Sequence, residues 1–415
     1  MKLIHYLSEN KIPILVFLII ICQNPIWPIL GFGIQLSFGL VLLLFLYKGK
    51  ALSKYTSTTS FVVSSLLMFL AFIIVPLRVP GFMYSNIIYY LCFLLAFFLR
   101  DSDYRKALLY LSKYIAIIIL ISLPAWLIHM FVTPLPVFGQ IDFSYFKGSD
   151  YMMNNYLLFI TNVNNIEESY RFYSMFDEPG VLGTLSAFVL FGNRYDFKKW
   201  YNIVILVGSL FTFSMAFFVV TAVGYMYIIL RNGKVKYFFR MLFLGVGIIF
   251  LLNTYSEGFQ NSVTHRLNDY GVAGSLNRRT KDIAEKKFND ELWSYDFFLG
   301  LGKERMNQGL REGASWKLFV LERGFFALVV LVFCYFLFVK KRNLDCKFFY
   351  LLFFASFTQR PLAFYAWQIL LFWCVMAQLT LTYKTNSKTI HTSTLRRLKY
   401  LINPPTWRNF LFPND

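Results

Sequence analysis

Two neighbouring carboxylates, Asp177 and Glu178, stand directly before a Pro-Gly pair, where a polar stretch of the chain turns into an apolar one. Proline is favoured in the first turn of a helix and acidic residues stabilise a helix start, so these residues by themselves indicate the beginning of a helix. A carboxylate beside apolar walls is also destabilised as an anion, which makes it a candidate base for removing the proton of a hydroxyl group. Arg171, a few residues earlier, would then pair with a phosphate group or simply with Glu178. Both interpretations, a helix start and a catalytic base, stay open on the sequence.

A second polar stretch carries two adjacent arginines, Arg278 and Arg279. If Asn277 caps a helix, both arginines lie in its first turn, where a cation opposes the helix dipole by ~0.3–1 kcal/mol unless an anion occupies the site. A helix N-terminus with two arginines is suited to binding a phosphate group. The alternative is a solvated turn in which the arginines pair with Asp269 or Asp282.

The same stretch holds further candidates for this chemistry. His265 is the only histidine in either long polar stretch and is the second candidate base, although a single loop histidine is usually a surface residue. Arg266 and Arg305 are candidate ligands for phosphate, and Arg305 follows Gly300-Leu-Gly, whose glycines would let the backbone approach a ligand. Arg360, beside a proline in a later polar turn, is expected on the same side of the molecule.

The elements that position these residues are predicted from the composition. Hydrophobic residues make up 57% of the chain and aromatic residues 20%, against about 45–50% apolar residues in soluble domains. We therefore predict an all-α, polytopic integral membrane protein. The formal charge of +19 comes from short basic clusters between apolar runs, where the positive-inside rule accounts for them. Nucleic acid is not expected as a partner.

Basic clusters and polar turns divide the chain into about twelve predicted transmembrane helices within one membrane domain, residues 1–415, with both termini in the cytoplasm. The apolar runs are 12–47 (two spans), 61–77, 82–99, 107–132, 179–192, 201–230 (two helices), 238–253, 318–339, 348–357 and 362–383. Two long loops, 133–178 and 254–316, are expected on the outer side, the first by charge bias and the second by the order of the spans, and residues 384–415 are expected to form a basic cytoplasmic tail.

The run 201–230 is bracketed by basic clusters at both ends, so a single crossing would put one cluster on the wrong side. We predict two short helices that meet near Thr212-Phe-Ser-Met. Such a break inside a membrane requires that the backbone be buried in protein or line a polar cavity.

Few ionisable residues fall inside the apolar runs. Lys113 and His129 lie towards the ends of the fifth span, and Glu322 and Arg323 lie near the start of the tenth. Ion-coupled transporters usually carry acids, bases or relays near the membrane midplane. For Glu322 and Arg323 we favour an ion pair that holds the helix over a catalytic role.

The cysteines and the N-terminus add little chemistry. Four of the five cysteines lie in apolar runs and Cys346 lies in a predicted cytoplasmic loop, so no disulfide is implied. The first apolar run has no small-residue cleavage site ahead of it and is interpreted as a retained span. No cluster of metal-ligating residues stands out, and neither a cofactor nor an essential metal is expected.

The arrangement resembles the O-antigen polymerase family, the Wzy-type polysaccharide polymerases that share a superfamily with the O-antigen ligases. The residues that carry the resemblance are Arg171 with Phe176-Asp-Glu-Pro-Gly, the broken helix pair around Phe213-Ser-Met, Arg278 and Arg279 ahead of Leu299-Gly-Leu-Gly, and Glu322-Arg-Gly. The resemblance covers most of residues 171–360 and, more loosely, the whole chain.

The resemblance implies an enzyme of the bacterial inner membrane whose active site faces the periplasm. It would transfer a glycan from undecaprenyl diphosphate to the terminal sugar hydroxyl of a second lipid-linked repeat unit, with a flippase and a chain-length regulator as partners. Fixed cations would stabilise the leaving diphosphate, and a base would activate the hydroxyl. The candidate cations are Arg171, Arg266, Arg278, Arg279, Arg305 and Arg360, and the candidate bases are Glu178, Asp177 and His265.

Two alternatives remain. A ligase of the same superfamily would move finished glycan to another acceptor, but ligases carry a histidine late in the second loop and residues 308–317 contain none. A flippase or other transporter of lipid-linked oligosaccharides would be expected to carry paired charges or half-helices facing a central cavity.

Overall fold

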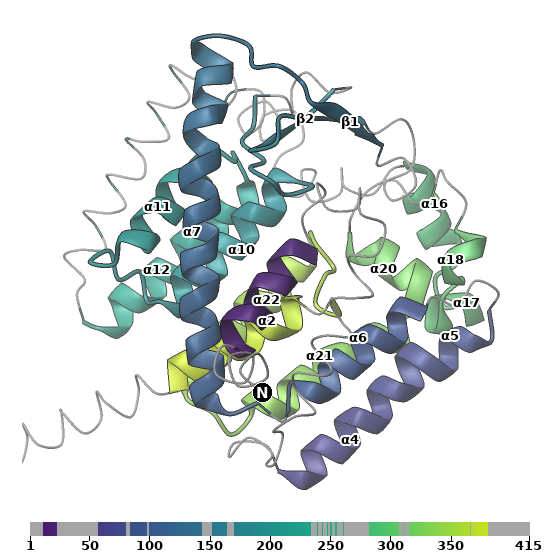
Figure 1. Cartoon of the computed structure of the whole chain (residues 1–415). Helices are drawn as coiled ribbons and strands as arrows, with labels where there is room; N and C mark the ends of the chain where they lie inside the picture. The colour runs from purple at the N-terminus through teal and green to yellow at the C-terminus, as the bar shows by residue number, and fades with distance from the viewer. Residues whose placement is uncertain are drawn as a thin grey trace, which may run out of the picture.

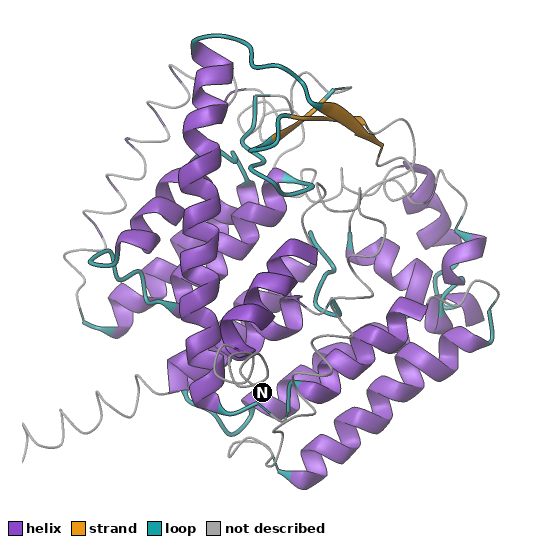
Figure 2. Cartoon of the chain, viewed as in Figure 1, coloured by secondary structure: helices purple, strands orange, loops and turns teal. Residues whose placement is uncertain are grey.

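The computed structural model describes residues 11–22, 57–79, 84–97, 99–142, 152–163, 170–233, 282–306, 315–365 and 367–380, together with residues 239, 243, 247, 250, 254, 260 and 310. Most of these residues are helical (Figures 1 and 2). The helices of the N-terminal half are α2 (Lys11–Cys22), α4 (Thr58–Phe69), the π-helical turn η2 (Leu70–Ile74), α5 (Val75–Leu77), α6 (Tyr84–Leu95), α7 (Asp101–Phe131) and α10 (Pro179–Gly192). Those that follow are α11 (Trp200–Leu210), α12 (Met215–Arg231), α16 (Asp282–Asp290), α17 (Tyr295–Leu299), α18 (Gly302–Arg305), α20 (Trp316–Arg323), α21 (Phe325–Val339), α22 (Leu344–Phe357) and a last helix, Trp367–Thr380.

Two of the described helices are long and apolar enough to cross a membrane on their own. They are the continuous 20-residue unit Thr58–Leu77, formed by α4, η2 and α5, and the 31-residue α7, which continues through Pro124. At 1.5 Å per residue α7 is about 46 Å long, more than the ~30 Å hydrocarbon core of a bilayer. The other apolar helices, including α10, α11 and α12, are shorter. The predicted helical class with potential spans is therefore confirmed, whereas the number of twelve spans stays a prediction.

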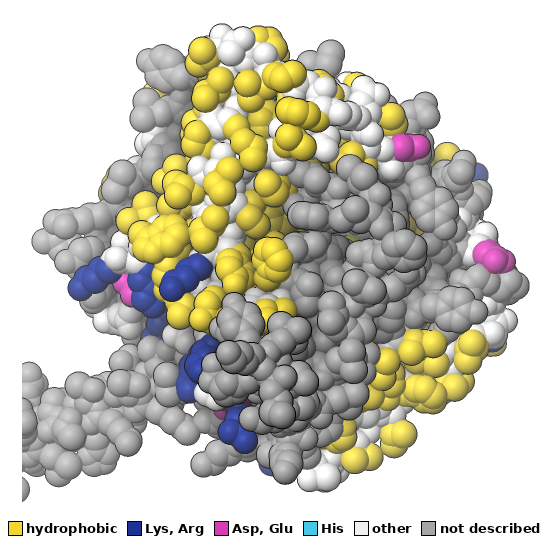
Figure 3. Space-filling model, viewed as in Figure 1, with side chains coloured by type: hydrophobic (Ala, Val, Ile, Leu, Met, Phe, Trp, Pro, Cys, Tyr) yellow, Lys and Arg dark blue, Asp and Glu magenta, His cyan; other side chains and the backbone are white. Residues whose placement is uncertain are grey.

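The surface of α7 is apolar where a soluble protein would be polar. Ile117, Leu120, Ile121, Ile128 and Phe131 are all exposed. Figure 3 shows hydrophobic side chains along this helix and Lys and Arg side chains gathered near its lower end. An apolar stripe of this length with a basic margin fits contact with lipid and an anionic or aqueous boundary at one end.

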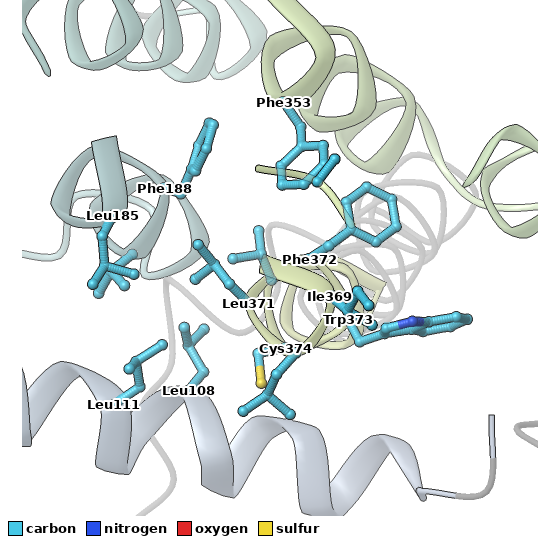
Figure 4. Packing of buried hydrophobic residues seen from close by; sticks show 14 of the residues in the cluster. Leu108, Leu111, Leu185, Phe188, Phe353, Ile369, Leu371, Phe372, Trp373 and Cys374 are labelled. Atoms are coloured by element: carbon cyan, nitrogen blue, oxygen red, sulfur yellow. The ribbon is translucent and has the colours of Figure 1, made fainter. Parts of the chain in front are cut away.

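The centre of the molecule is built around α10 and the last helix, Trp367–Thr380. All fourteen residues of α10 are buried. Leu185 and Phe188 of α10 pack with Leu371 of the last helix and Leu108 of α7 (Figure 4). A helix that is apolar on all sides is stable only inside a larger assembly. The sequence thus places α10, whose first residue follows Glu178, in the interior of the helical bundle.

The predicted break in residues 201–230 is present. α11 ends at Leu210, α12 begins at Met215, and the turn between them places Phe213 at φ +44°. Ser214 caps α12 by accepting a hydrogen bond from the Phe217 backbone N–H. The peptide groups at this turn are buried and bonded within the protein, as a helix break in a membrane requires.

A second break was not predicted. The run 318–339 was expected to be one span, but α20 and α21 meet at Gly324 with a bend of 112°. Gly324 has φ +91° and Gly300 has φ +83°, and a Cβ built on Gly300 would lie 2.6 Å from the Gly324 nitrogen. The close approach of the two glycines, and not a proline or a polar run, causes this bend.

The first long loop contains a small antiparallel sheet that was not expected. Its strands are β1 (Gly139–Asp142), β2 (Met152–Asn155) and β3 (Ile160–Asn162), in the order β1-β2-β3. Met153, Ile160 and Tyr173 form a small apolar cluster beneath it. Strands of three or four residues in a polar loop lack a visible alternation of apolar residues, which explains why the sequence did not reveal them.

Candidate functional site

The structure joins two of the predicted site residues directly. Glu178 is the N-cap residue of α10 with extended backbone angles, but its side chain makes no capping hydrogen bond. Instead its Oε2 atom accepts a hydrogen bond from Nη1 of Arg360, which lies in the turn after α22. The helix start predicted for Asp177-Glu178-Pro179 is therefore present, and the carboxylate of Glu178 is used for an ion pair between segments.

Arg360 lies at a position where a positive charge is destabilised unless an anion is close to it. Its side chain is 6% exposed, and its Nε atom is buried without a hydrogen-bond partner. The guanidinium covers Gly180, so that a Cβ built there would lie 2.7 Å from the Arg360 Cζ. A cation at the N-terminus of α10 adds to the positive end of the helix dipole. Glu178 offsets this charge, and the Nε hydrogen remains available for a further acceptor.

Arg171 contacts main-chain oxygen atoms of the turn between α11 and α12. It is buried, its Nε donates to the carbonyl oxygen of Thr212 at 3.0 Å, and its Nη2 lies 3.4 Å from the carbonyl oxygen of Phe213. The adjacent Phe172 N–H donates to the Phe211 carbonyl at 2.9 Å. These bonds fix the turn between α11 and α12 against the start of α10, so the structure shows a positioning contact for Arg171.

Glu322 and Arg323 end helix α20, and the expected ion pair is present at 3.5 Å. Arg323 also donates from Nη1 to Oδ1 of Asn86 on α6 at 3.0 Å. Its Cζ atom lies 5.9 Å from the ring centroid of Phe72 and 5.5 Å from that of Phe364. These cation–π contacts and the Asn86 bond hold the guanidinium between three segments that are distant in the sequence.

Tyr365 connects the two groups of charged residues. The last helix begins at Trp367, so Tyr365 lies in the turn before it, together with Arg360. The predicted span 362–383 would have put Tyr365 inside the helix. Burial raises the pKa of Tyr365; the positive charge of Arg323 opposes this shift, and the carboxylates of Glu322 and Asp177 add to it. The charges of Asp177, Glu322 and Arg323 thus act on one hydroxyl group, that of Tyr365.

Other predicted residues lie apart from this site. Arg305 belongs to the exposed helix α18, where it pairs with Asp296 at 3.4 Å, and α18 lies across the molecule from α10 (Figure 1). The glycines before it pack on the protein itself: Leu301 N–H donates to the Leu321 carbonyl at 2.7 Å, and Arg78 donates to the Gly300 carbonyl at 2.7 Å. Gly300 and Gly302 therefore allow close packing of the backbone within the protein. The sequence had suggested that they let the backbone approach a ligand.

Four candidates, His265, Arg266, Arg278 and Arg279, lie outside the described residues, and their roles stay predictions. Within the part of the chain that the structure describes, no group of three or more His, Cys, Asp or Glu side chains is placed to hold a metal ion. Sequence reasoning missed Tyr365, Asn86 and the aromatic partners of Arg323, because no local pattern distinguishes them from other residues in aromatic-rich runs.

The opposite ends of the helices carry a separate ionic cluster. Asp345 is buried and pairs with Arg194 at 2.6 Å and with Arg231, and it accepts a hydrogen bond from Tyr227 at 2.9 Å. Arg194, Arg231 and Asp345 come from three loops predicted on the cytoplasmic side. Residues predicted on the outer side, such as Glu178 and Arg360, likewise contact one another.

Comparisons with protein-family models, with curated protein sequences and with solved structures gave no match. The chemistry of the site is therefore derived from its own geometry.

Proposed function

We propose that this chain is a membrane-embedded glycosyltransferase that polymerises lipid-linked oligosaccharide repeat units. The observation that carries the proposal is the Glu178–Arg360 pair at the N-terminus of the buried helix α10, with Asp177 beside it. The pair puts a carboxylate and a fixed cation side by side at the end of an apolar bundle, where transfer from a lipid diphosphate needs both.

The proposed reaction is a single group transfer. The hydroxyl oxygen of the acceptor sugar attacks the anomeric carbon of the donor glycan, and the bond from that carbon to the diphosphate oxygen breaks with its electron pair on the diphosphate. The hydroxyl proton passes to a carboxylate, Asp177 or Glu178, and is later released to solvent. The products are the lengthened lipid-linked glycan and free undecaprenyl diphosphate.

Arg360 is the best placed of the described residues to stabilise the leaving diphosphate. Its charge stands at a helix N-terminus that itself attracts anions, and its buried Nε hydrogen lacks an acceptor. Arg266, Arg278 and Arg279, which lie outside the described residues, complete the proposed set of cations. Arg171 supports the site through the turn at Thr212 and Phe213.

The proposed location is a bacterial inner membrane, with the Glu178–Arg360 end facing the periplasm. Apolar helices of spanning length, the exposed apolar stripe of α7 and the basic residues near one end of it support this orientation. The proposed substrate is an undecaprenyl-diphosphate-linked oligosaccharide, and the proposed partners are a flippase and a chain-length regulator.

The test uses purified full-length protein in detergent with lipid-linked repeat units as the only substrate. The expected result is a ladder of glycans on the lipid carrier with release of undecaprenyl diphosphate, reduced at least a hundredfold by Arg360→Ala and by Arg279→Ala. Failure of the wild-type protein to form any glycosidic bond would overturn the proposal. Transfer of finished polymer to a different acceptor, without lengthening of the lipid-linked glycan, would show instead that the protein is a ligase.

A further inference from the structure

Four aromatic rings lie together beside the charged residues of the site. Phe72, in the π-helical turn η2, stacks on Phe364 with ring centroids 3.8 Å apart. Tyr89 of α6 contacts Phe364 at 5.6 Å and Tyr365 at 5.0 Å. The guanidinium of Arg323 lies against Phe72 and Phe364, so the rings and the arginine form one unit. π-helical turns occur often at functional sites, and here the turn supplies the innermost ring.

The rings of this aromatic cluster differ in burial: the inner rings are buried and support an outer ring that is partly exposed. Phe72 and Phe364 are buried, whereas Tyr365 is 37% exposed. The carboxylate side chain of Glu322 is 36% exposed, and that of Arg323 is 13% exposed. An aromatic ring held rigidly from behind, with an exposed carboxylate at its side, is organised to receive something from outside the protein.

The charges decide which class of ligand fits. The guanidinium of Arg323 already contacts the Glu322 carboxylate at 3.5 Å and Asn86 at 3.0 Å and is only 13% exposed, so this cluster offers a phosphate group no exposed and unshared cation. An organic ammonium ion, the usual guest of an aromatic cluster, would compete with Arg323, which already lies on the inner rings. A neutral polyol meets neither objection, because a sugar ring places its C–H face on an aromatic ring and its hydroxyl groups on carboxylates and guanidinium groups.

We infer that Tyr365 and Glu322 form the subsite that binds the acceptor sugar. The inference rests on the proposed function and names the residues that select its acceptor. Tyr365 and Arg360 belong to the same short turn between α22 and the last helix. A sugar stacked on Tyr365 therefore lies next to the Glu178–Arg360 pair, with its hydroxyl groups towards the carboxylates and the donor diphosphate towards Arg360.

The test measures sugar binding without any transfer reaction. The probe is the free repeat-unit oligosaccharide, released from the surface polysaccharide of the source organism, and binding to the purified full-length protein is measured by saturation-transfer NMR and by titration. Tyr365→Ala is expected to weaken binding about tenfold, and Tyr365→Phe, which keeps the ring, by no more than about threefold. Glu322→Gln, which keeps the size of the side chain, is expected to weaken binding several-fold.

The matched control is Tyr295→Ala in α17. Tyr295 is also an exposed tyrosine, and Arg78 lies 4.8 Å from its ring centroid; its loss is expected to leave binding unchanged. Unchanged binding in both Tyr365→Ala and Glu322→Gln, or equal loss in Tyr295→Ala, would overturn the inference. Because the assay contains no lipid-linked donor, binding that depends on Tyr365 in a protein without polymerase activity would contradict the proposed function alone. Polymerisation with acceptor affinity independent of Tyr365 would contradict the subsite alone.

Discussion

The guanidinium of Arg360 occupies the space above Gly180 that a side chain at that position would take. The ion pair with Glu178 therefore depends on a glycine in the first turn of α10.

Gly180→Ala is accordingly expected to displace the guanidinium and to lower the proposed polymerase activity at least tenfold. Alanine favours a helix over glycine by up to about 1 kcal/mol, so loss of activity without loss of helix content is the expected signature. Activity is measured on the lipid-linked substrate and helix content by circular dichroism. Gly139→Ala, where a Cβ meets nothing within 4 Å, is the control and should be indistinguishable from wild type. Full activity of Gly180→Ala would show that the position of Arg360 is not critical.

Loss of Glu178 and loss of Arg360 should destabilise the protein by different amounts. Arg360 is 6% exposed and Glu178 is 26% exposed, so Glu178→Gln leaves the more deeply buried charge without its counter-ion. We expect Glu178→Gln to lower the free energy of unfolding by about 2–3 kcal/mol and Arg360→Gln by about 1–2 kcal/mol. Thermal unfolding in detergent checks the order, and the double variant gives the coupling. A larger effect of Arg360→Gln would contradict the burial argument.

Gly324→Ala is expected to be more destabilising than an ordinary glycine substitution. The residue combines φ +91° with a Cβ position 2.6 Å from the Leu299 carbonyl carbon. Backbone strain alone costs on the order of 1–2 kcal/mol, and the overlap adds to it. Gly233→Ala, at φ +67° with open space around it, isolates the strain. Equal stabilities of the two variants, measured by thermal unfolding, would mean that the contact between α20–α21 and the loop before α18 is dispensable.

Asp345→Asn should weaken the end of the bundle that carries Arg194 and Arg231 and leave the Glu178–Arg360 site intact. The buried carboxylate is shared by Arg194 and Arg231, and the change removes the anion that both cations contact, at a cost of about 3 kcal/mol. The expected result is a lower unfolding temperature with unchanged oligosaccharide binding per folded molecule. Glu285→Gln, which breaks the more exposed pair with Lys317, should have a much smaller effect. A loss of sugar binding in Asp345→Asn would show that the two ends are coupled.

The sequence predicted those features that depend on composition and charge. The apolar runs gave α7 and the α4–α5 unit, and the basic clusters around 201–230 gave the break at Phe213. The break at Gly324 could not be predicted, because it depends on contact with Gly300, which is distant in the sequence. A local pattern reports only on neighbouring residues.

In the candidate site, too, the sequence predicted some features and not others. Glu178 was predicted from its place before a proline, and Arg360 from its place in an outer turn, but their pairing depends on the packing of α10 beside the turn after α22. Arg171 was predicted as a ligand, whereas the structure shows it bonded to main-chain carbonyl oxygens at Thr212 and Phe213. Tyr365 gave no signal at all, since an aromatic residue in an aromatic-rich run looks like core.

The burial of α10 along its whole length limits the directions from which reactants can reach the site. All fourteen residues of the helix are covered by neighbouring elements, so the side chains of Glu178 and Arg360 meet the outside only at the end where the helix begins. If that end faces the periplasm, as proposed, the buried helix separates the compartment of the proposed reaction from the one in which its precursors are made.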